Sequence, residues 1–177
     1  MAFKEYILEA IINDLSLCQH LYDKIPEGSM DKRPREDMRS TKELLQYLSR
    51  TASITIESFA SGGWCVPENI ARVKERRAIA ATLDPKDFVT IVEEEKRLIT
   101  DLLKPFSDHD LLTMETVLPW GVKVKLVEAL LNNSLKYMAA YRLQLFLYAK
   151  MWGAEIGTSN AWVGRDPKPK AETAAVN

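Results

Sequence analysis

The side chains that most often catalyse reactions or bind metals are few in this chain. It contains two histidines, His20 and His109, and two cysteines, Cys18 and Cys65, among 177 residues. Neither histidine belongs to an HxxxH or HExxH pair, and the cysteines form no CxxC motif. The sequence also lacks a GxSxG motif, a glycine-rich phosphate loop and a Ser/His/Asp arrangement. We therefore interpret His20 and His109 as structural residues and predict no histidine-based metal motif.

Composition and charge are those of an ordinary globular protein, with 46% apolar residues, 28% charged residues and a formal net charge of -1. Such a charge gives no general attraction to nucleic acid or acidic lipid. The basic run Arg72 to Arg77 has no interleaved aromatic residues, so we interpret it as a solvated loop face. The sparse, distant cysteines favour a reducing compartment, and neither a signal peptide nor a membrane-spanning stretch is apparent. We expect a cytoplasmic protein without nucleic-acid or membrane partners.

Apolar residues recur at helical spacing in four long stretches. The second stretch opens with a capping box, in which the side chains of Ser40 and Glu43 each accept a hydrogen bond from a backbone N–H. Glycine and proline mark the ends of the stretches. We predict helices from Phe3 to Ile25, from Ser40 to the Gly62-Gly63 pair, from Asp84 to just before Pro105, and from Val122 to Trp152.

The connecting segments carry weaker signals. Trp64 to Ala81 is mixed in character, and we predict a long loop with one short helix at most. Asp108 to Leu112 adds a turn of helix, and Thr113 to Gly121 is a connector. Within the third helix, Glu93 to Arg97 is interpreted as a solvated face.

These elements predict an all-α protein, a four-helix bundle with one long crossover loop. Residues 1–164 form the bundle, and residues 165–177 are expected to be a disordered tail. The apolar helix faces exceed what one bundle of this length needs to bury. We therefore expect a homodimer.

Two segments carry motifs that resemble the DinB/YfiT family. Members commonly show a Pro-Glu, an Arg-Pro and then a helix reading Ser-x-x-Glu-Leu-Leu-x-His-Leu. Here the corresponding residues are Ile25-Pro26-Glu27-Gly28, Arg33-Pro34 and Met38-Arg39-Ser40-Thr41-Lys42-Glu43-Leu44-Leu45-Gln46-Tyr47-Leu48. The family's last helix reads His-x-x-x-His-Arg-Gly-Gln-Leu, and this chain has Tyr137-Met138-Ala139-Ala140-Tyr141-Arg142-Leu143-Gln144-Leu145. The resemblance covers essentially Met1 to Gly164.

The resemblance implies a bundle that holds a divalent metal such as Zn or Ni on three histidines. Characterised relatives include thiol-dependent transferases and isomerases, and others are described as metal-dependent hydrolases or as products induced by DNA damage. In this chain Tyr47, Tyr137 and Tyr141 stand at all three histidine positions. A neutral imidazole offers a lone pair at pH 7, whereas a phenol, with a reference pKa of about 10, must first lose a proton. We therefore expect no metal cofactor.

The three tyrosines have two possible roles. One is aromatic core packing, with the hydroxyls hydrogen-bonded to one another, to water or to backbone. The other is an amphipathic pocket that binds a small organic ligand. Possible neighbours in such a pocket are Asn133, Arg142, Gln144 and His20, although Arg142 is more simply explained by an ion pair between helices.

The leading hypothesis is a DinB-like bundle without the metal-binding histidines, which serves as a metal-independent ligand-binding or interaction protein. The alternative is a thiol-dependent transferase or metal-dependent hydrolase that uses other ligands, such as His20 with a carboxylate. A third possibility is a structural protein without a small-molecule site. No catalytic residue is predicted.

Overall fold

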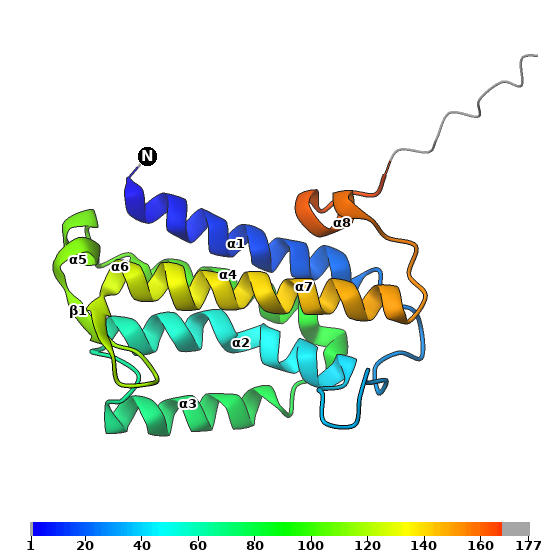
Figure 1. Ribbon diagram of the computed structural model, residues 1–177, viewed down its shortest axis with the longest axis horizontal. Coiled ribbons are helices and arrows are strands. Elements are labelled where there is room, and N and C mark those ends of the chain that lie inside the picture. The colour runs from blue at the N-terminus through cyan, green and yellow to red at the C-terminus, as the bar shows by residue number, and fades with distance from the viewer. Residues whose placement is uncertain (1, 168–177) are drawn as a thin grey trace, which may run out of the picture.

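The computed structural model describes residues 2–167 as a bundle of long helices (Figure 1). Helices α1 (Phe3–Tyr22), α2 (Thr41–Ala60) and α4 (Phe88–Leu103) lie alongside a final long helix. That final helix consists of α6 (Leu126–Ala129), a π-helical segment η2 (Leu130–Leu135) and α7 (Lys136–Met151). Helix α1 packs against α4 and α7, and α2 packs against the same two helices from the other side. The predicted all-α four-helix bundle is confirmed.

The start of α2 forms as the sequence predicts. The backbone N–H of Ser40 donates to Glu43 Oε2 at 2.6 Å, and the backbone N–H of Glu43 donates to Ser40 Oγ at 3.2 Å. Both bonds satisfy backbone donors that a helix terminus would otherwise leave unpaired. The first turn of α2 is therefore held at a defined place, directly after the connection that leads from α1.

The prediction of a long loop between Trp64 and Ala81 is wrong. This segment contains α3 (Pro67–Ala80), a helix of 14 residues that packs against α2 on the outside of the bundle (Figure 1). Pro67 occupies the first turn, where its missing N–H costs no helical hydrogen bond. Periodicity failed to reveal the helix because only Asn69, Val73 and Ala80 are buried along it.

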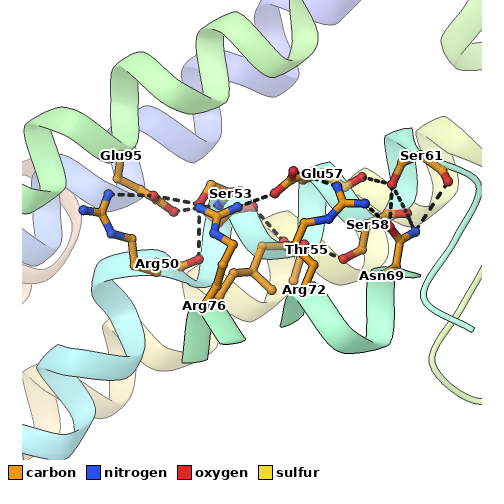
Figure 2. A network of polar contacts seen from close by, with 12 residues as sticks. Arg50, Ser53, Thr55, Glu57, Ser58, Ser61, Asn69, Arg72, Arg76 and Glu95 are labelled. Atoms are coloured by element: carbon orange, nitrogen blue, oxygen red, sulfur yellow. Dashed lines mark hydrogen bonds and ion pairs between the residues drawn. The ribbon is translucent and has the colours of Figure 1, made fainter. Parts of the chain in front are cut away.

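Polar contacts take the place of the missing apolar face (Figure 2). Glu57 of α2 pairs with Arg72 at 2.7 Å and also with Arg76, and the side-chain amide of Asn69 donates to the carbonyl of Gly63 at 2.7 Å. The interpretation of Arg72 to Arg77 as a solvated loop face is therefore wrong for Arg72 and Arg76. Their ion pairs with Glu57 hold α3 against α2.

Glu95 also departs from the expectation of a solvated face on the third helix. Its side chain is completely buried between α4 and α2. It accepts hydrogen bonds from the backbone N–H of Ser53 at 2.6 Å and from Ser53 Oγ at 2.8 Å, and a guanidinium nitrogen of Arg50 lies 3.6 Å away (Figure 2). Loss of hydration raises the pKa of Glu95, and the Ser53 hydrogen bonds and the nearby arginines oppose that rise.

The segment before the final helix folds as a small hairpin. Strand β1 (Glu115–Val117) pairs antiparallel with β2 (Lys123–Lys125), so the last helix starts at Leu126 and not at Val122 as predicted. The hairpin lies against the end of α2, where the backbone N–H of Trp64 donates to the carbonyl of Val117 at 2.8 Å. A Cβ atom at Gly63 would lie 2.5 Å from Val117 N, so only glycine permits this approach.

Short elements complete the chain. The 3₁₀ turn η1 (Pro85–Asp87) precedes α4, α5 (Asp108–Thr113) follows it, and α8 (Thr158–Val163) packs on α1 after the turn at Gly153. Within the segment predicted as a tail, Asp166 pairs with Lys24 at 2.7 Å. The remainder of that segment, residues 168–177, lies outside the described residues.

Leucine, isoleucine and phenylalanine side chains from the four long helices form one continuous core, which includes Ile11, Leu15, Leu44, Leu48, Phe59, Phe88, Ile99 and Leu145. Among residues 2–167, no helix combines the length and the apolarity that crossing a bilayer requires.

Candidate functional site

The three tyrosines that the resemblance aligns with the family's histidines lie together. Tyr47 comes from α2, and Tyr137 and Tyr141 come from successive turns of the facing helix α7. The ring centroids of Tyr47 and Tyr141 are 4.7 Å apart, and those of Tyr137 and Tyr141 are 6.3 Å apart. Residues four apart share one helix face, which explains why both rings of α7 reach the same place. The three rings form a continuous aromatic cluster between α2 and α7.

Tyr47 is partly buried, and its surroundings disfavour the phenolate. Loss of hydration is the larger reason that the pKa of Tyr47 lies above its ordinary value, and the neighbouring phenol of Tyr141 adds to the effect. Arg77 opposes the shift more weakly. At neutral pH the Tyr47 hydroxyl is therefore protonated and available as a hydrogen-bond donor.

A pocket of about 470 Å³ opens beside Tyr47. Its walls are the connection that precedes α2, one face of α2, and the last turn of α3 with the residue after it. The lining residues are Arg33, Glu36, Asp37, Met38, Arg39, Glu43, Gln46, Tyr47, Thr51, Ile54, Arg77, Ala80 and Ala81. Tyr47 is the member of the tyrosine cluster that lines this space, and Tyr141 packs behind its ring. A volume of this size suits a small organic molecule.

Two arginines that the sequence analysis did not assign to a pocket flank Tyr47. The guanidinium carbon of Arg39 lies 4.2 Å from the centroid of the Tyr47 ring, and that of Arg77 lies 6.0 Å from it. Arg39 also lies 5.7 Å from the Tyr141 ring, and Arg77 lies 5.5 Å from the Trp64 ring. Arg39 directly precedes the Ser40 cap, which was the one available signal for its placement. Arg77 could not be placed without recognising α3.

A hydrogen-bonded chain from α7 holds the segment that carries Arg39. The side-chain amide of Gln144 donates to the hydroxyl of Tyr148 at 2.9 Å, and that hydroxyl donates to the backbone carbonyl of Arg39 at 3.0 Å. Gln144 was a predicted neighbour of the pocket. It does not line the pocket itself, but it is connected through Tyr148 to a residue that does.

The other predicted neighbours lie elsewhere. Asn133 is buried in η2, and His20 lies beside α8 with its Nε2 3.1 Å from the side-chain nitrogen of Asn160. Arg142 points away from the tyrosines, pairs with Asp14 of α1 at 2.9 Å and donates to the carbonyl of Ala161. Burial raises the pKa of Asp14, although Arg142 opposes the rise. Arg142 thus forms the ion pair between helices that the sequence favoured.

The donor set at the tyrosine cluster does not suit a divalent metal. Zn²⁺ and Ni²⁺ favour imidazole, thiolate or carboxylate ligands, whereas the three side chains here are phenols, and the pKa of Tyr47 is raised further. Elsewhere in residues 2–167, histidine, cysteine, aspartate and glutamate side chains form no group of three or more that could hold a metal ion.

The bundle, the long connection into α2 and the facing positions on α2 and α7 define a DinB-like fold. The comparison with solved structures agrees. The chain is similar to the crystal structure of "a putative member of the DinB family" from Exiguobacterium sibiricum 255-15, with a TM-score of 0.67 and 19% sequence identity over 90% of this chain and 98% of that one. No protein-family model matches the sequence, and no curated protein matches it. The DinB-like fold that the two motifs predicted is confirmed.

Proposed function

We propose that this protein is a metal-independent small-ligand-binding protein, and that its ligand occupies the pocket beside Tyr47. The observation that carries the proposal is the position of that pocket. It is lined by Tyr47, whose ring lies 4.7 Å from that of Tyr141 of α7, and the resemblance aligns both tyrosines with metal-binding histidines of the family. Phenols in place of imidazoles leave the space without metal ligands but give it an aromatic wall and a protonated hydroxyl.

The lining residues support binding of an amphipathic molecule. Tyr47, Ile54 and the two alanines Ala80 and Ala81 offer apolar surface, while charged side chains of the connection and of α3 surround it. Binding sites for small molecules combine such apolar surface with a few placed polar groups.

The test has a metal arm and a ligand arm. Elemental analysis of protein purified without chelator should find no stoichiometric transition metal, and about one Zn, Ni or Fe ion per chain would overturn the metal-independent part of the proposal. For the ligand arm, ¹⁵N-labelled protein is titrated with benzoate, phenyl phosphate, benzyl alcohol and benzylamine. At least one compound should shift backbone amides of the connection before α2, of α2 around Tyr47, and of the α3 end.

A pocket-filling variant provides the control. Ala81 is exposed at the pocket wall, so Ala81→Trp should occupy the space without disturbing the core. It should keep the melting temperature of the parent protein and lose the amide shifts. Shifts that persist in this variant, or the absence of pocket shifts with all four compounds, would overturn the proposal.

A further inference from the structure

The charges around the pocket are not all neutralised by one another. Arg33 pairs with Glu43 at 3.5 Å, and Asp37 pairs with Arg35 at 3.1 Å. Arg39 and Arg77, in contrast, have no ion-pair partner and donate no side-chain hydrogen bond within residues 2–167. Glu36 is the one lining carboxylate without such a partner in the same part of the chain. The lining carries three arginines and three carboxylates, and the charges without an ion-pair partner are those of two arginines and one glutamate.

Both arginines also lie close to aromatic rings. The guanidinium carbon of Arg39 lies over the Tyr47 ring, 4.2 Å from its centroid. That of Arg77 lies 6.0 Å from the Tyr47 centroid and 5.5 Å from the Trp64 centroid. A guanidinium that stacks on an aromatic face keeps the N–H groups of its edge free, and those groups match the two oxygens of a carboxylate or phosphate. Cation–π contacts thus hold both guanidinium groups near the rings, and neither group donates a side-chain hydrogen bond within residues 2–167.

The two arginines come from different elements, and both lie beside the Tyr47 ring. Arg39 ends the connection before α2 and is restrained by the bond from the Tyr148 hydroxyl to its carbonyl at 3.0 Å. Arg77 lies in the last turn of α3, directly after Arg76, which pairs with Glu57. Each backbone position is therefore restrained by other contacts, and the guanidinium groups remain free for a ligand.

We infer that the pocket binds an organic anion, a small molecule that carries a carboxylate or phosphate group on an apolar body. Arg39 and Arg77 bind the oxyanion, and the Tyr47 ring and Ile54 contact the apolar body. This inference rests on the proposed function and specifies the chemical class of its ligand.

The four probes used above differ mainly in charge, so their ranking tests the inference. Benzoate and phenyl phosphate should bind at least about tenfold more tightly than benzyl alcohol, and benzylamine should bind most weakly. Their dissociation constants are measured from the amide shifts of the pocket residues. The comparison of benzoate with phenyl phosphate identifies which oxyanion the two arginines prefer, and inorganic phosphate alone measures the contribution of the apolar body.

Substitutions of the two arginines test whether they bind the anion. Arg39→Gln and Arg77→Gln should each weaken phenyl phosphate binding at least about tenfold and leave benzyl alcohol binding unchanged. Arg97→Gln is the matched control, because Arg97 is an exposed arginine of α4 outside this pocket. Arg39→Lys, which keeps the charge but loses the planar fork, should retain part of the affinity. Melting temperatures verify that each variant is folded.

The outcomes separate this inference from the proposed function. If benzyl alcohol and benzylamine bind the pocket as tightly as the anions, the ligand-binding function stands and the anion inference is wrong. If the anions bind but both glutamine variants retain parental affinity, Arg39 and Arg77 are not the anion site. If none of the compounds shifts a pocket amide, the proposed function fails and the inference fails with it.

Discussion

At the scale of single residues, Tyr47 shows how side-chain type limits what the contact between α2 and α7 can bind. Its ring is 4.7 Å from that of Tyr141, so the meeting of α2 and α7 is intact. The donor atoms nevertheless belong to phenols, and the pKa of Tyr47 is raised mainly by burial. The neutral phenol donates a hydrogen bond but binds a divalent ion poorly. The tyrosine cluster therefore offers an aromatic surface with a neutral hydroxyl and does not offer imidazole ligands.

Restoring imidazoles should restore metal binding. We expect the triple variant Tyr47→His, Tyr137→His and Tyr141→His to bind about one Ni²⁺ or Zn²⁺ per chain, because the three positions converge and neutral imidazoles provide the ligands. Isothermal titration calorimetry measures the affinity, and circular dichroism verifies the fold. The variant that carries histidine only at Tyr137 and Tyr141 should bind more weakly. A folded triple variant without metal affinity would contradict the convergence of these side chains.

Sequence reasoning located part of the candidate site. The aligned motifs placed Tyr47, Tyr137 and Tyr141 together because helical spacing of four residues and a fixed topology determine their positions. Arg39 and Arg77 were not identified. Their significance depends on side-chain rotamers and on which charges are paired, and neither property can be deduced from one sequence. Arg142 adjoins Tyr141 in the chain but lies on another side of the helix, where it forms the ion pair with Asp14 of α1 that the sequence favoured.

At the scale of secondary-structure elements, α3 is held to α2 by charge more than by apolar packing. Glu57 contacts both Arg72 and Arg76, and its side chain is 25% exposed. We expect Glu57→Gln to lower the free energy of unfolding by about 1–2 kcal/mol, in line with charge-assisted hydrogen bonds that are partly solvated. Hydrogen exchange of the α3 amides should accelerate more than that of α4. Urea denaturation and exchange mass spectrometry measure the two effects.

Glu75→Gln is the matched control for this experiment. Glu75 is an exposed glutamate of α3 that has no ion-pair partner within residues 2–167. Its replacement should leave exchange and stability nearly unchanged. Because Arg77 is carried by α3, Glu57→Gln should also weaken the binding of phenyl phosphate. Unchanged exchange in α3 would show that the Glu57 contacts do not hold this helix.

Buried Glu95 makes the contact between α2 and α4 depend on pH. Its folded-state pKa lies above the ordinary value of 4.5, so the folded protein retains this proton more strongly than the unfolded chain does. The stability that Glu95 contributes is therefore complete below about pH 4.5 and decreases as the pH rises through the folded-state pKa. Melting temperatures measured across this range should show the decrease.

Glu95→Gln should remove this part of the pH dependence, since a glutamine remains neutral and its carbonyl oxygen can still accept hydrogen bonds from Ser53. The comparison is with Glu9→Gln, which replaces an exposed glutamate of α1. That variant should follow the parental pH profile. A Glu95→Gln profile that parallels the parent would show that another group causes the pH dependence.

The elements that sequence analysis predicted well are those stabilised by apolar burial. Helices α1, α2, α4 and α7 have an apolar face. The capping box of Ser40 and Glu43 identifies the residue at which α2 begins. The errors fall where polar contacts dominate. Helix α3 lacks an apolar stripe, Glu95 sits in a run of charges, and the hairpin before α6 has strands of three residues. The spacing of apolar residues cannot reveal an element that is held in place mainly by polar contacts.

At the scale of the whole molecule, five of the fourteen exposed large apolar side chains within residues 2–167 lie on α7 and α8. Leu143, Leu147 and Met151 of α7 are 49%, 47% and 56% exposed, and they are spaced four residues apart on one helix face. Trp162 and Val163 of α8 are also exposed. The sequence led us to expect a homodimer because its apolar faces exceed what one bundle buries. The regular apolar stripe on α7 is a candidate surface for that contact.

We propose that a second copy of the chain covers this face, since a regular stripe on one helix can pack against the same stripe of its twofold mate. Light scattering coupled to size exclusion should give twice the chain mass. Leu143→Asp with Leu147→Asp should yield a monomer whose core is unchanged, because both side chains are exposed in the single chain. Ile79→Asp is the control, as Ile79 is 54% exposed but lies on α3. It should leave the dimer intact, and a monomeric parent protein would contradict the proposal.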